Sequence, residues 1–244
     1  YLITEPIAEL TARDEKLPLL RDPDSSYYLR QEKDGLLLGP YEKNCRAHWL
    51  SSDDPMPDDF SFQLYNDDLE RLEWYIEDAC ARVPILGTAG ITRVVNGPIP
   101  YTPDGLPLIG PMPSVPNAFE ACVFTFGIVQ AGGAGKLLAE IIIEGETESD
   151  SWAVDPRRFT DHVDTAYTAA KAIETYSHEY AMHFPQIQWP AGRKSKYSPL
   201  YDRLAAAGAE FGSYGGWERA DWFSTNAADR RPADSYDRQH WFDA

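Results

Sequence analysis

A strand-like run that ends in glycines and continues as an apolar helix is the strongest constraint on the fold of this chain. Residues 117–136 read NAFEACVFTFGIVQAGGAGK, with an apolar, β-prone stretch from Ala121 to Phe126 that stops at Gly127. We expect a glycine-rich turn next, followed by a helix over the segment KLLAEIII. The first N–H groups of a helix lack partners within it, so such a turn can bind an anion or an electron-rich ring edge. A plain strand-turn-helix with small residues for close packing explains the segment equally well.

Two phosphate-binding motifs are excluded at this turn. A P-loop requires a glycine five residues before its Gly-Lys pair and a serine or threonine after it. Gln130 and Leu137 stand at those positions, which excludes a nucleotide triphosphatase. The dinucleotide fingerprint G-x-G-x-x-G also fails, because Gly133 and Gly135 are followed by Leu138 where the third glycine belongs.

The composition indicates a folded protein with a large negative charge. The chain has 244 residues, of which 43% are hydrophobic and 13% aromatic, enough for a sizeable core. Its formal net charge of −17 argues against nucleic acid and against an anionic membrane surface as partners. No apolar run approaches the ~20 residues of a membrane-spanning helix. The opening YLITEPI, without an initiator Met, suggests a fragment of a longer protein.

Cysteines and histidines form no metal-binding pattern. Cys45, Cys80 and Cys122 lie far apart, without a C-x-x-C pair, which favours a reducing compartment. His178 and His183 are five residues apart on a stretch that we expect to be helical, so they do not share one face. We therefore expect no metal site.

The first part of the chain indicates strands joined by tight turns. The expected strands are residues 1–8, 17–21 and 26–31. The turn Lys33-Asp34-Gly35 predicts a hairpin over residues 26–41. A helix is expected from Asn66 or Asp67 to Arg82. Strands paired through hairpins with helices between them favour an α+β fold with a mainly antiparallel sheet.

The character of the sequence changes from about residue 152. We expect a helix over 164–180, then a loop-rich tail with one short helix. The basic cluster at 193–196 is interpreted as a solvated loop, and the aromatic stretch 217–223 as a surface for a partner domain. We divide the chain into a domain of residues 1–158 and a second, mostly helical or irregular domain of residues 159–244.

Three long segments resemble the dimethylglycine dehydrogenase and sarcosine dehydrogenase family of flavoproteins. They are SSYYLRQEKDGLLLGPYE (25–42), VVNGPIPYTPDGLPLIGP (94–111) and FTFGIVQAGGAGK (124–136). The segments DPRRF, KAIETYSHEYAMHFP, AGRKSKYSPLYDRL and GWERADWF are similar to the central connector of the same proteins. The resemblance therefore covers nearly the whole chain.

The resemblance implies a specific place within a larger flavoprotein. Residues 1–158 would be the substrate half of an FAD-dependent oxidoreductase domain with a D-amino-acid-oxidase-like fold, and residues 159–244 the central connector. An N-terminal segment would carry the covalently attached FAD and the flavin fingerprint. A C-terminal aminomethyltransferase-like domain could bind tetrahydrofolate. By the same resemblance an active-site histidine precedes the first strand, so the chain alone is expected to be inactive.

The resemblance also assigns roles to individual residues. The expected FAD-contacting residues of the glycine-rich segment are Gly127, Ile128, Val129, Gln130, Gly132 and Gly133. Asp104 lies in the turn 102–105, which is similar to the family's segment beside the flavin, so a contact between Asp104 and FAD is expected. A tight turn ordered by Asp and Gly explains this sequence equally well.

Tyr27 is the expected catalytic residue on the substrate side. Strand parity alone leaves Tyr27 and Tyr28 open, and the resemblance selects Tyr27, whose phenol would orient the amine or the carboxylate. A core or cross-strand aromatic is the alternative. Arg30 lies on the opposite face from Tyr27 if the strand is regular, so pairing with Glu32 or Glu42 is expected for it.

The function implied is oxidative N-demethylation of dimethylglycine, within choline and betaine catabolism and one-carbon metabolism. The expected partners are a small N-methylated amino acid and the N- and C-terminal domains of the same protein. The resemblance favours an electron acceptor other than oxygen, whose identity the sequence does not give. Sarcosine or another N-methylated amino acid is an alternative substrate, and a non-catalytic regulatory relative is an alternative of another class. The expected location is the bacterial cytoplasm or, alternatively, the mitochondrial matrix.

Overall fold

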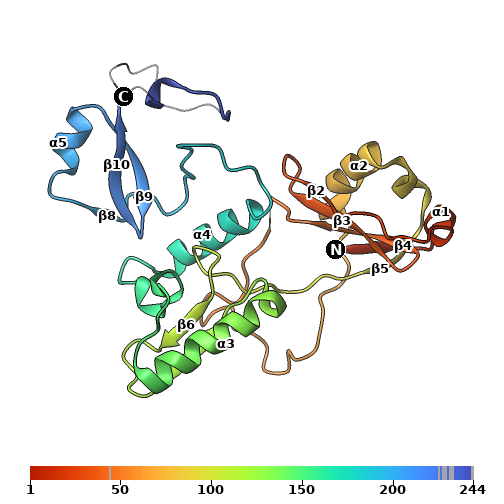
Figure 1. The fold of residues 1–244 in the computed structure, drawn as a ribbon, viewed down its shortest axis with the longest axis horizontal. Helices are drawn as coiled ribbons and strands as arrows, with labels where there is room; N and C mark the ends of the chain where they lie inside the picture. The colour runs from red at the N-terminus through yellow and green to blue at the C-terminus, as the bar shows by residue number, and fades with distance from the viewer. Residues whose placement is uncertain (44, 225, 227–229, 231–233, 243–244) are drawn as a thin grey trace. The chain divides into compact units, whose positions relative to one another are not determined.

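The computed structural model describes residues 1–43, 45–224, 226, 230 and 234–242 (Figure 1). The chain divides into two compact units. Unit 1 contains Tyr1–Ile99 and Ile173–Met182, and unit 2 contains Pro100–Ala172 and His183–Ala244. Helix α4 (Thr165–Ser177) contributes residues to both units. The units differ from the expected division after residue 158, which stays a prediction about domains.

Unit 1 is built on a five-stranded antiparallel sheet with the order β2-β3-β4-β1-β5. The bounds are β1 Leu2–Thr4, β2 Leu20–Asp22, β3 Tyr27–Glu32, β4 Gly35–Pro40 and β5 Ile91–Val94. Strands β3 and β4 form the expected hairpin, in which Glu32 pairs with Gly35. Lys33 has a left-handed backbone (φ 53°) at the turn, which suits a tight hairpin loop.

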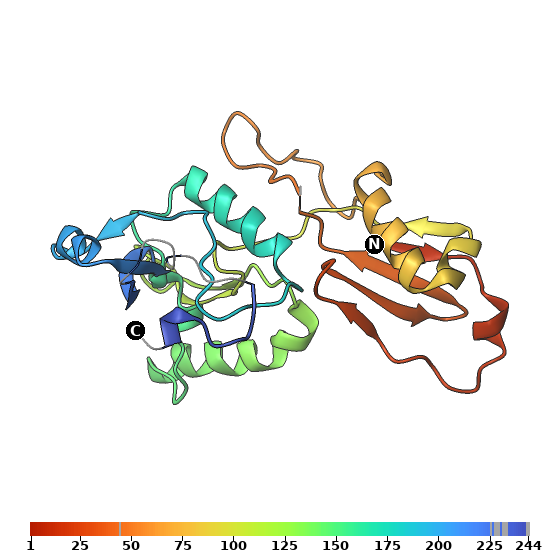
Figure 2. The ribbon, with the colours of Figure 1, turned by 90° about the horizontal axis from the view of Figure 1, so that it is seen from above.

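One face of this sheet is covered by helix α2 (Glu73–Arg82), which lies across the strands (Figure 2). Tyr75 and Ala79 of α2 are buried in the same apolar cluster as Leu29 and Leu38 of the sheet. Burial of each such leucine stabilises the fold by ~1.5–3 kcal/mol. The short helices of unit 1 are α1 Ala8–Thr11 and the 3₁₀ turns η1 Glu70–Leu72 and η2 Pro84–Thr88.

The opposite face of the sheet is covered by residues 173–182. The Tyr180 ring lies edge-on to Tyr28, with 5.7 Å between ring centroids, and 4.7 Å from the Tyr41 ring. The Ser26 hydroxyl donates to the carbonyl of Ser177 at 3.4 Å. Because both faces are covered, strand β4 is buried along its whole length.

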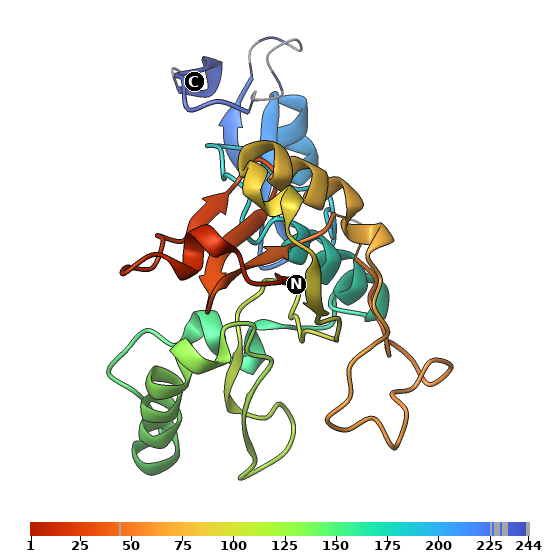
Figure 3. The same ribbon diagram turned by 90° about the vertical axis from the view of Figure 1, so that its right-hand side faces the viewer.

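A long irregular loop joins β4 to α2 (Figure 3). Aromatic side chains within this loop pack on one another. Trp49 packs on Phe60 with 4.8 Å between centroids, and Tyr65 lies 5.8 Å from Phe60. A loop of this length that packs on itself is uncommon outside functional segments.

Unit 2 begins with a β-hairpin that leads into the longest helix of the described residues. Strands β6 (Leu108–Pro111) and β7 (Phe119–Cys122) pair antiparallel, and α3 (Gly127–Glu144) follows β7 and lies beside β6 (Figure 1). A second sheet has the order β8-β10-β9. The remaining elements are η3 Trp152–Val154, η4 Pro156–Arg158, β8 Lys196–Tyr197, α5 Tyr201–Ala206, β9 Ala209–Tyr214, β10 Trp217–Phe223 and η6 His240–Phe242.

The expected α+β fold with mainly antiparallel strands is confirmed, but several boundaries were wrong. The strand expected over 1–8 ends at Thr4, because Pro6 cannot donate to a neighbouring strand and helix α1 begins at Ala8. The helix expected from residue 66 starts as a 3₁₀ turn at Glu70. The glycines after residue 127 lie within α3 and not in a turn before it.

The tail also differs from the expected loop, because β9 and β10 form a hairpin there. Arg193 does not belong to a solvated loop: its guanidinium donates to the buried carboxylate of Glu218 at 2.9 Å and 2.5 Å. Although burial acts to raise the pKa of Glu218, hydrogen bonds from Arg193 and from the Lys194 N–H hold it below its ordinary value.

Candidate functional site

Helix α3 begins after a strained connection from strand β7. β7 ends at Cys122, and Val123 then has a left-handed backbone with φ of 58°. A β-branched residue rarely adopts this conformation, and such strain is concentrated at functional sites. Phe126 forms the N-terminal boundary of α3, with no side-chain hydrogen bond that caps the helix.

The first turn of α3 presents backbone donors at an exposed surface. The first helical bond runs from the Gln130 N–H to the Phe126 carbonyl at 3.2 Å. The N–H groups of Gly127, Ile128 and Val129 precede it and have no acceptor within the helix. The side chains of Ile128 and Val129 are 97% and 81% exposed. Donors and the positive end of the helix dipole therefore meet at one accessible helix end.

The glycines of this segment have a different role from the one expected of a turn. Gly132 and Gly133 lie inside α3, so their N–H groups serve the helix, and a Cβ added at either would meet nothing within 4 Å. They form a bare, exposed strip on the helix next to Val129. Gln130 differs from these exposed residues, because its Oε1 atom is buried and accepts no hydrogen bond from the described residues.

Asp104 is engaged within the chain. Its carboxylate accepts two hydrogen bonds from the guanidinium of Arg158, at 2.7 Å and 2.9 Å. The Leu106 N–H donates to the same carboxylate at 3.1 Å, and the Thr102 hydroxyl at 2.9 Å. The geometry supports an ordered turn, while a contact between Asp104 and FAD stays a prediction.

Tyr27 lies in the core between the sheet and α2, and not at a surface. Its side chain is 1% exposed, within the apolar cluster of unit 1. Its hydroxyl has no well-formed hydrogen bond among the described residues. Burial, then the charges of Asp22 and Asp78, raise the pKa of Tyr27 to about 12. This placement matches the core alternative for Tyr27, and its catalytic role stays a prediction.

Tyr28 occupies the other face of β3, because successive side chains of a strand alternate. Its ring lies against the backbone of Gly39, where an added Cβ would come within 2.2 Å of the ring. Arg30, on the same face, pairs with Glu32 at 2.5 Å, which confirms one of its two expected partners.

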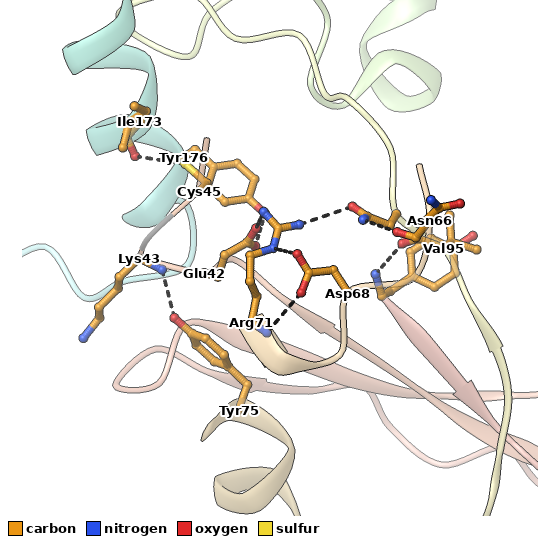
Figure 4. Close-up of polar contacts among 12 residues, drawn as sticks. Glu42, Lys43, Cys45, Asn66, Asp68, Arg71, Tyr75, Val95, Ile173 and Tyr176 are labelled. Carbon is orange, nitrogen blue, oxygen red and sulfur yellow. Dashed lines mark hydrogen bonds and ion pairs between the residues drawn. The ribbon is translucent and has the colours of Figure 1, made fainter. Parts of the chain in front are cut away.

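A half-buried carboxylate, Glu42, joins distant segments of unit 1 (Figure 4). The Tyr176 hydroxyl of α4 donates to Glu42 Oε2 at 2.5 Å, and Arg71 Nη1 lies 3.6 Å from Glu42 Oε1. Arg71 also pairs with Asp68 at 2.8 Å. Burial, then the charge of Glu42, raises the pKa of Tyr176 well above its ordinary value. The protonated phenol thus fastens the end of α4 to the beginning of the long loop.

Sequence reasoning missed the residues that organise these contacts. Arg158 belongs to the DPRRF motif, which the sequence connects only to the family resemblance, and its partner Asp104 is 54 residues away. Glu42 and Tyr176 lie in quoted segments as well, 134 residues apart. An arginine or a carboxylate within a long matching motif is the available signal, but its partner is visible only in the fold.

The comparison with known families decides the class of protein. Residues 1–141 match the FAD dependent oxidoreductase family. The chain belongs to this family. Residues 144–198 match the FAD dependent oxidoreductase central domain.

The chain is similar over nearly its whole length to three named dehydrogenases or oxidases. It is 40% identical to human mitochondrial dimethylglycine dehydrogenase over 248 residues, covering 100% of this chain and 28% of that protein. It is 37% identical to human mitochondrial sarcosine dehydrogenase over 228 residues, covering 91% and 24%. It is 36% identical to 4-methylaminobutanoate oxidase (formaldehyde-forming) of Paenarthrobacter nicotinovorans over 238 residues, covering 97% and 28%.

The chain spans less than a third of the length of these three relatives. Throughout the part of the chain that the structure describes, no helix combines the length and the apolar character needed to cross a membrane.

Proposed function

We propose that this chain is the substrate half, with the central connector, of an FAD-dependent enzyme that oxidatively N-demethylates dimethylglycine. The observation that carries the proposal is the exposed N-terminal turn of α3, whose first N–H groups have no acceptor within the helix and lie beside a bare glycine strip. This surface suits a flat, electron-rich ring system that gains negative charge during the reaction.

The residues around α3 fit FAD on chemical grounds. The Gly127, Ile128 and Val129 N–H groups would donate to the ring edge on which negative charge builds. Gly132 and Gly133 would let the ring lie against backbone, because no Cβ stands in its way. The orphaned Oε1 of Gln130 would accept from a ring N–H.

Bound FAD would supply the hydride-accepting chemistry that amine oxidation requires. The residues of this chain then have two tasks. They must hold the N-methyl carbon of the substrate close to the reactive part of the cofactor. They must also stabilise negative charge with donors that are already oriented, as the first turn of α3 does without reorganisation.

Dimethylglycine is proposed as the substrate in preference to sarcosine. The chain is 40% identical to a dimethylglycine dehydrogenase and 37% identical to a sarcosine dehydrogenase, a small difference. The segments SYYLRQE and NGPIPYTPDG resemble dimethylglycine dehydrogenase more closely than sarcosine dehydrogenase. The two substrates differ by one methyl group, and pocket contacts discriminate such a difference by ~1–3 kcal/mol.

The test uses the full-length protein that carries this chain. Its flavin absorbance at about 450 nm is followed after anaerobic mixing with dimethylglycine or with sarcosine. Bleaching that is faster with dimethylglycine is the expected result. Faster bleaching with sarcosine would replace the substrate and keep the class of enzyme. A purified protein without flavin, or with a flavin that no N-methylated amino acid bleaches, would favour a non-catalytic relative.

A further inference from the structure

Arg158 is a buried arginine whose hydrogen bonds converge on one turn of unit 2. Its side chain is 3% exposed. Nε donates to Asp104 Oδ2 at 2.7 Å and Nη2 to Asp104 Oδ1 at 2.9 Å, a two-pronged pair. Nη2 also donates to the Leu106 carbonyl at 2.8 Å, and Nη1 to the Asp155 carbonyl at 3.2 Å. The guanidinium thus holds both the side chain and the backbone of the segment 104–106.

The segment that Arg158 holds is an ordered turn. Gly105 has a left-handed backbone with φ of 75°, and its N–H donates to the Thr102 carbonyl at 3.1 Å. Asp104 accepts from the Leu106 N–H at 3.1 Å, so its carboxylate orders the turn from within. Arg158 adds the external partner that fixes where this turn lies.

This turn leads into the strands that carry helix α3. It is followed by β6, and β6 pairs with β7, which ends just before the first turn of α3. The η4 segment with Arg158 packs on β6: a Cβ added at Gly110 would lie 3.3 Å from Pro156 Cδ. The arginine therefore supports the same hairpin from the turn and from the strand.

We propose that Arg158 is a positioning residue, which holds the Asp104 turn and strand β6 so that the N-terminal turn of α3 is presented in the geometry that FAD binding requires. This inference rests on the proposed function, because it assigns a consequence for the cofactor to a contact within the chain. Under this proposal Asp104 does not contact the cofactor directly. It accepts the two hydrogen bonds by which Arg158 clamps the turn.

The neighbouring residue offers a matched control. Arg157 pairs with Asp155 at 2.5 Å, but its side chain is 66% exposed. An exposed pair contributes little to stability, whereas removal of one partner from a buried pair is costly. Arg157→Met and Arg158→Met therefore remove the same chemical group from adjacent positions in different environments.

The experiment compares Arg158→Met, Arg158→Lys and Arg157→Met in the full-length protein. Two readouts are used: amide hydrogen exchange at Gly105 and Leu106, and the flavin reduction potential. We expect Arg158→Met to speed exchange of these amides by about tenfold or more. We also expect it to shift the potential, with Arg157→Met matching the wild type in both readouts. Arg158→Lys should not rescue either readout, because one ammonium cannot replace the fork of a guanidinium.

Several results would overturn the proposal. Wild-type exchange at the turn in Arg158→Met would show that the clamp does not order it. Faster exchange together with an unchanged potential would limit Arg158 to local stability. If Arg158→Met does not fold, the same outcomes are judged on Arg158→Lys. If the wild-type protein holds no flavin, the proposed function fails and the positioning role fails with it, while exchange still tests the clamp itself.

Discussion

Replacement of Tyr27 by phenylalanine separates the role implied by resemblance from the role indicated by the structure. The substitution removes only the hydroxyl, which is buried without a well-formed hydrogen bond among the described residues. The ring would keep its place between the sheet and α2, where the side chain is 1% exposed.

The magnitude follows from this environment. The hydroxyl faces Asp78 and Arg82 without a hydrogen bond of good geometry. Tyr27→Phe therefore relieves only part of the ~1–3 kcal/mol cost of an unsatisfied buried polar group. The small cavity left by the missing oxygen atom offsets this gain in stability by about a few tenths of a kcal/mol. We therefore expect stability between unchanged and ~2 kcal/mol higher, with kcat within about twofold of the wild type. A catalytic phenol would instead contribute ~10²–10⁴-fold to the rate.

The assay measures anaerobic flavin reduction by dimethylglycine and amide exchange in β3, both in the full-length protein. Tyr28→Phe is the companion variant, because Tyr28 lies on the opposite face of the same strand. A loss of about 100-fold in the reduction rate of Tyr27→Phe, with exchange in β3 unchanged, would refute the core interpretation. It would support the catalytic role that the resemblance assigns to Tyr27.

Two further predictions concern the hydrogen-bonded carboxylates of Glu42 and Glu218. Tyr176→Phe removes the 2.5 Å hydrogen bond to Glu42, so residues 173–182 should exchange their amides faster, while Tyr197→Phe, at an exposed position, should have no such effect. Wild-type exchange in Tyr176→Phe would contradict a fastening role. The pKa of Glu218 is held below its ordinary value, so its contribution to stability is present above that ordinary pKa and is lost as the pH falls through the lowered one. Acid unfolding should therefore be less steep in Glu218→Gln, and an identical pH profile in the two proteins would contradict this linkage.

Local signals predicted some elements well because their causes are local. Lys33-Asp34-Gly35 indicated a hairpin, and the chain turns there with Lys33 in a left-handed conformation. The periodic apolar residues before Arg82 indicated a helix, and α2 ends at that residue.

Other elements depend on contacts that local patterns do not contain. Glycine disfavours helices, so Gly132 and Gly133 suggested a turn, yet both lie within α3. The tail hairpin of β9 and β10 contains Glu218, whose partner Arg193 is 25 residues away.

In the candidate site, too, the local elements could be predicted from the sequence and the long-range contacts could not. The strand, the glycines and the helix were visible in the sequence, and they placed interest on the beginning of α3. The position of Tyr27 depended on which face α2 covers, and strand parity alone cannot tell that. The partnership of Asp104 with Arg158 required the fold, because no local rule pairs residues 54 positions apart.

The most direct test of the account measures the flavin reduction potential when one donor of α3 is removed. Ile128→Pro deletes an N–H in the first turn, where no helical bond is lost, and the residue before it is a glycine. Ile128→Ala keeps the N–H and removes only a 97% exposed side chain, so it serves as the control. A lost donor to a charged ring is worth ~1.5–3 kcal/mol, or ~30–60 mV for a two-electron couple. We expect Ile128→Pro to lower the potential by that amount while Ile128→Ala stays near the wild type; an unchanged potential in Ile128→Pro would contradict the claim that α3 stabilises the reduced flavin.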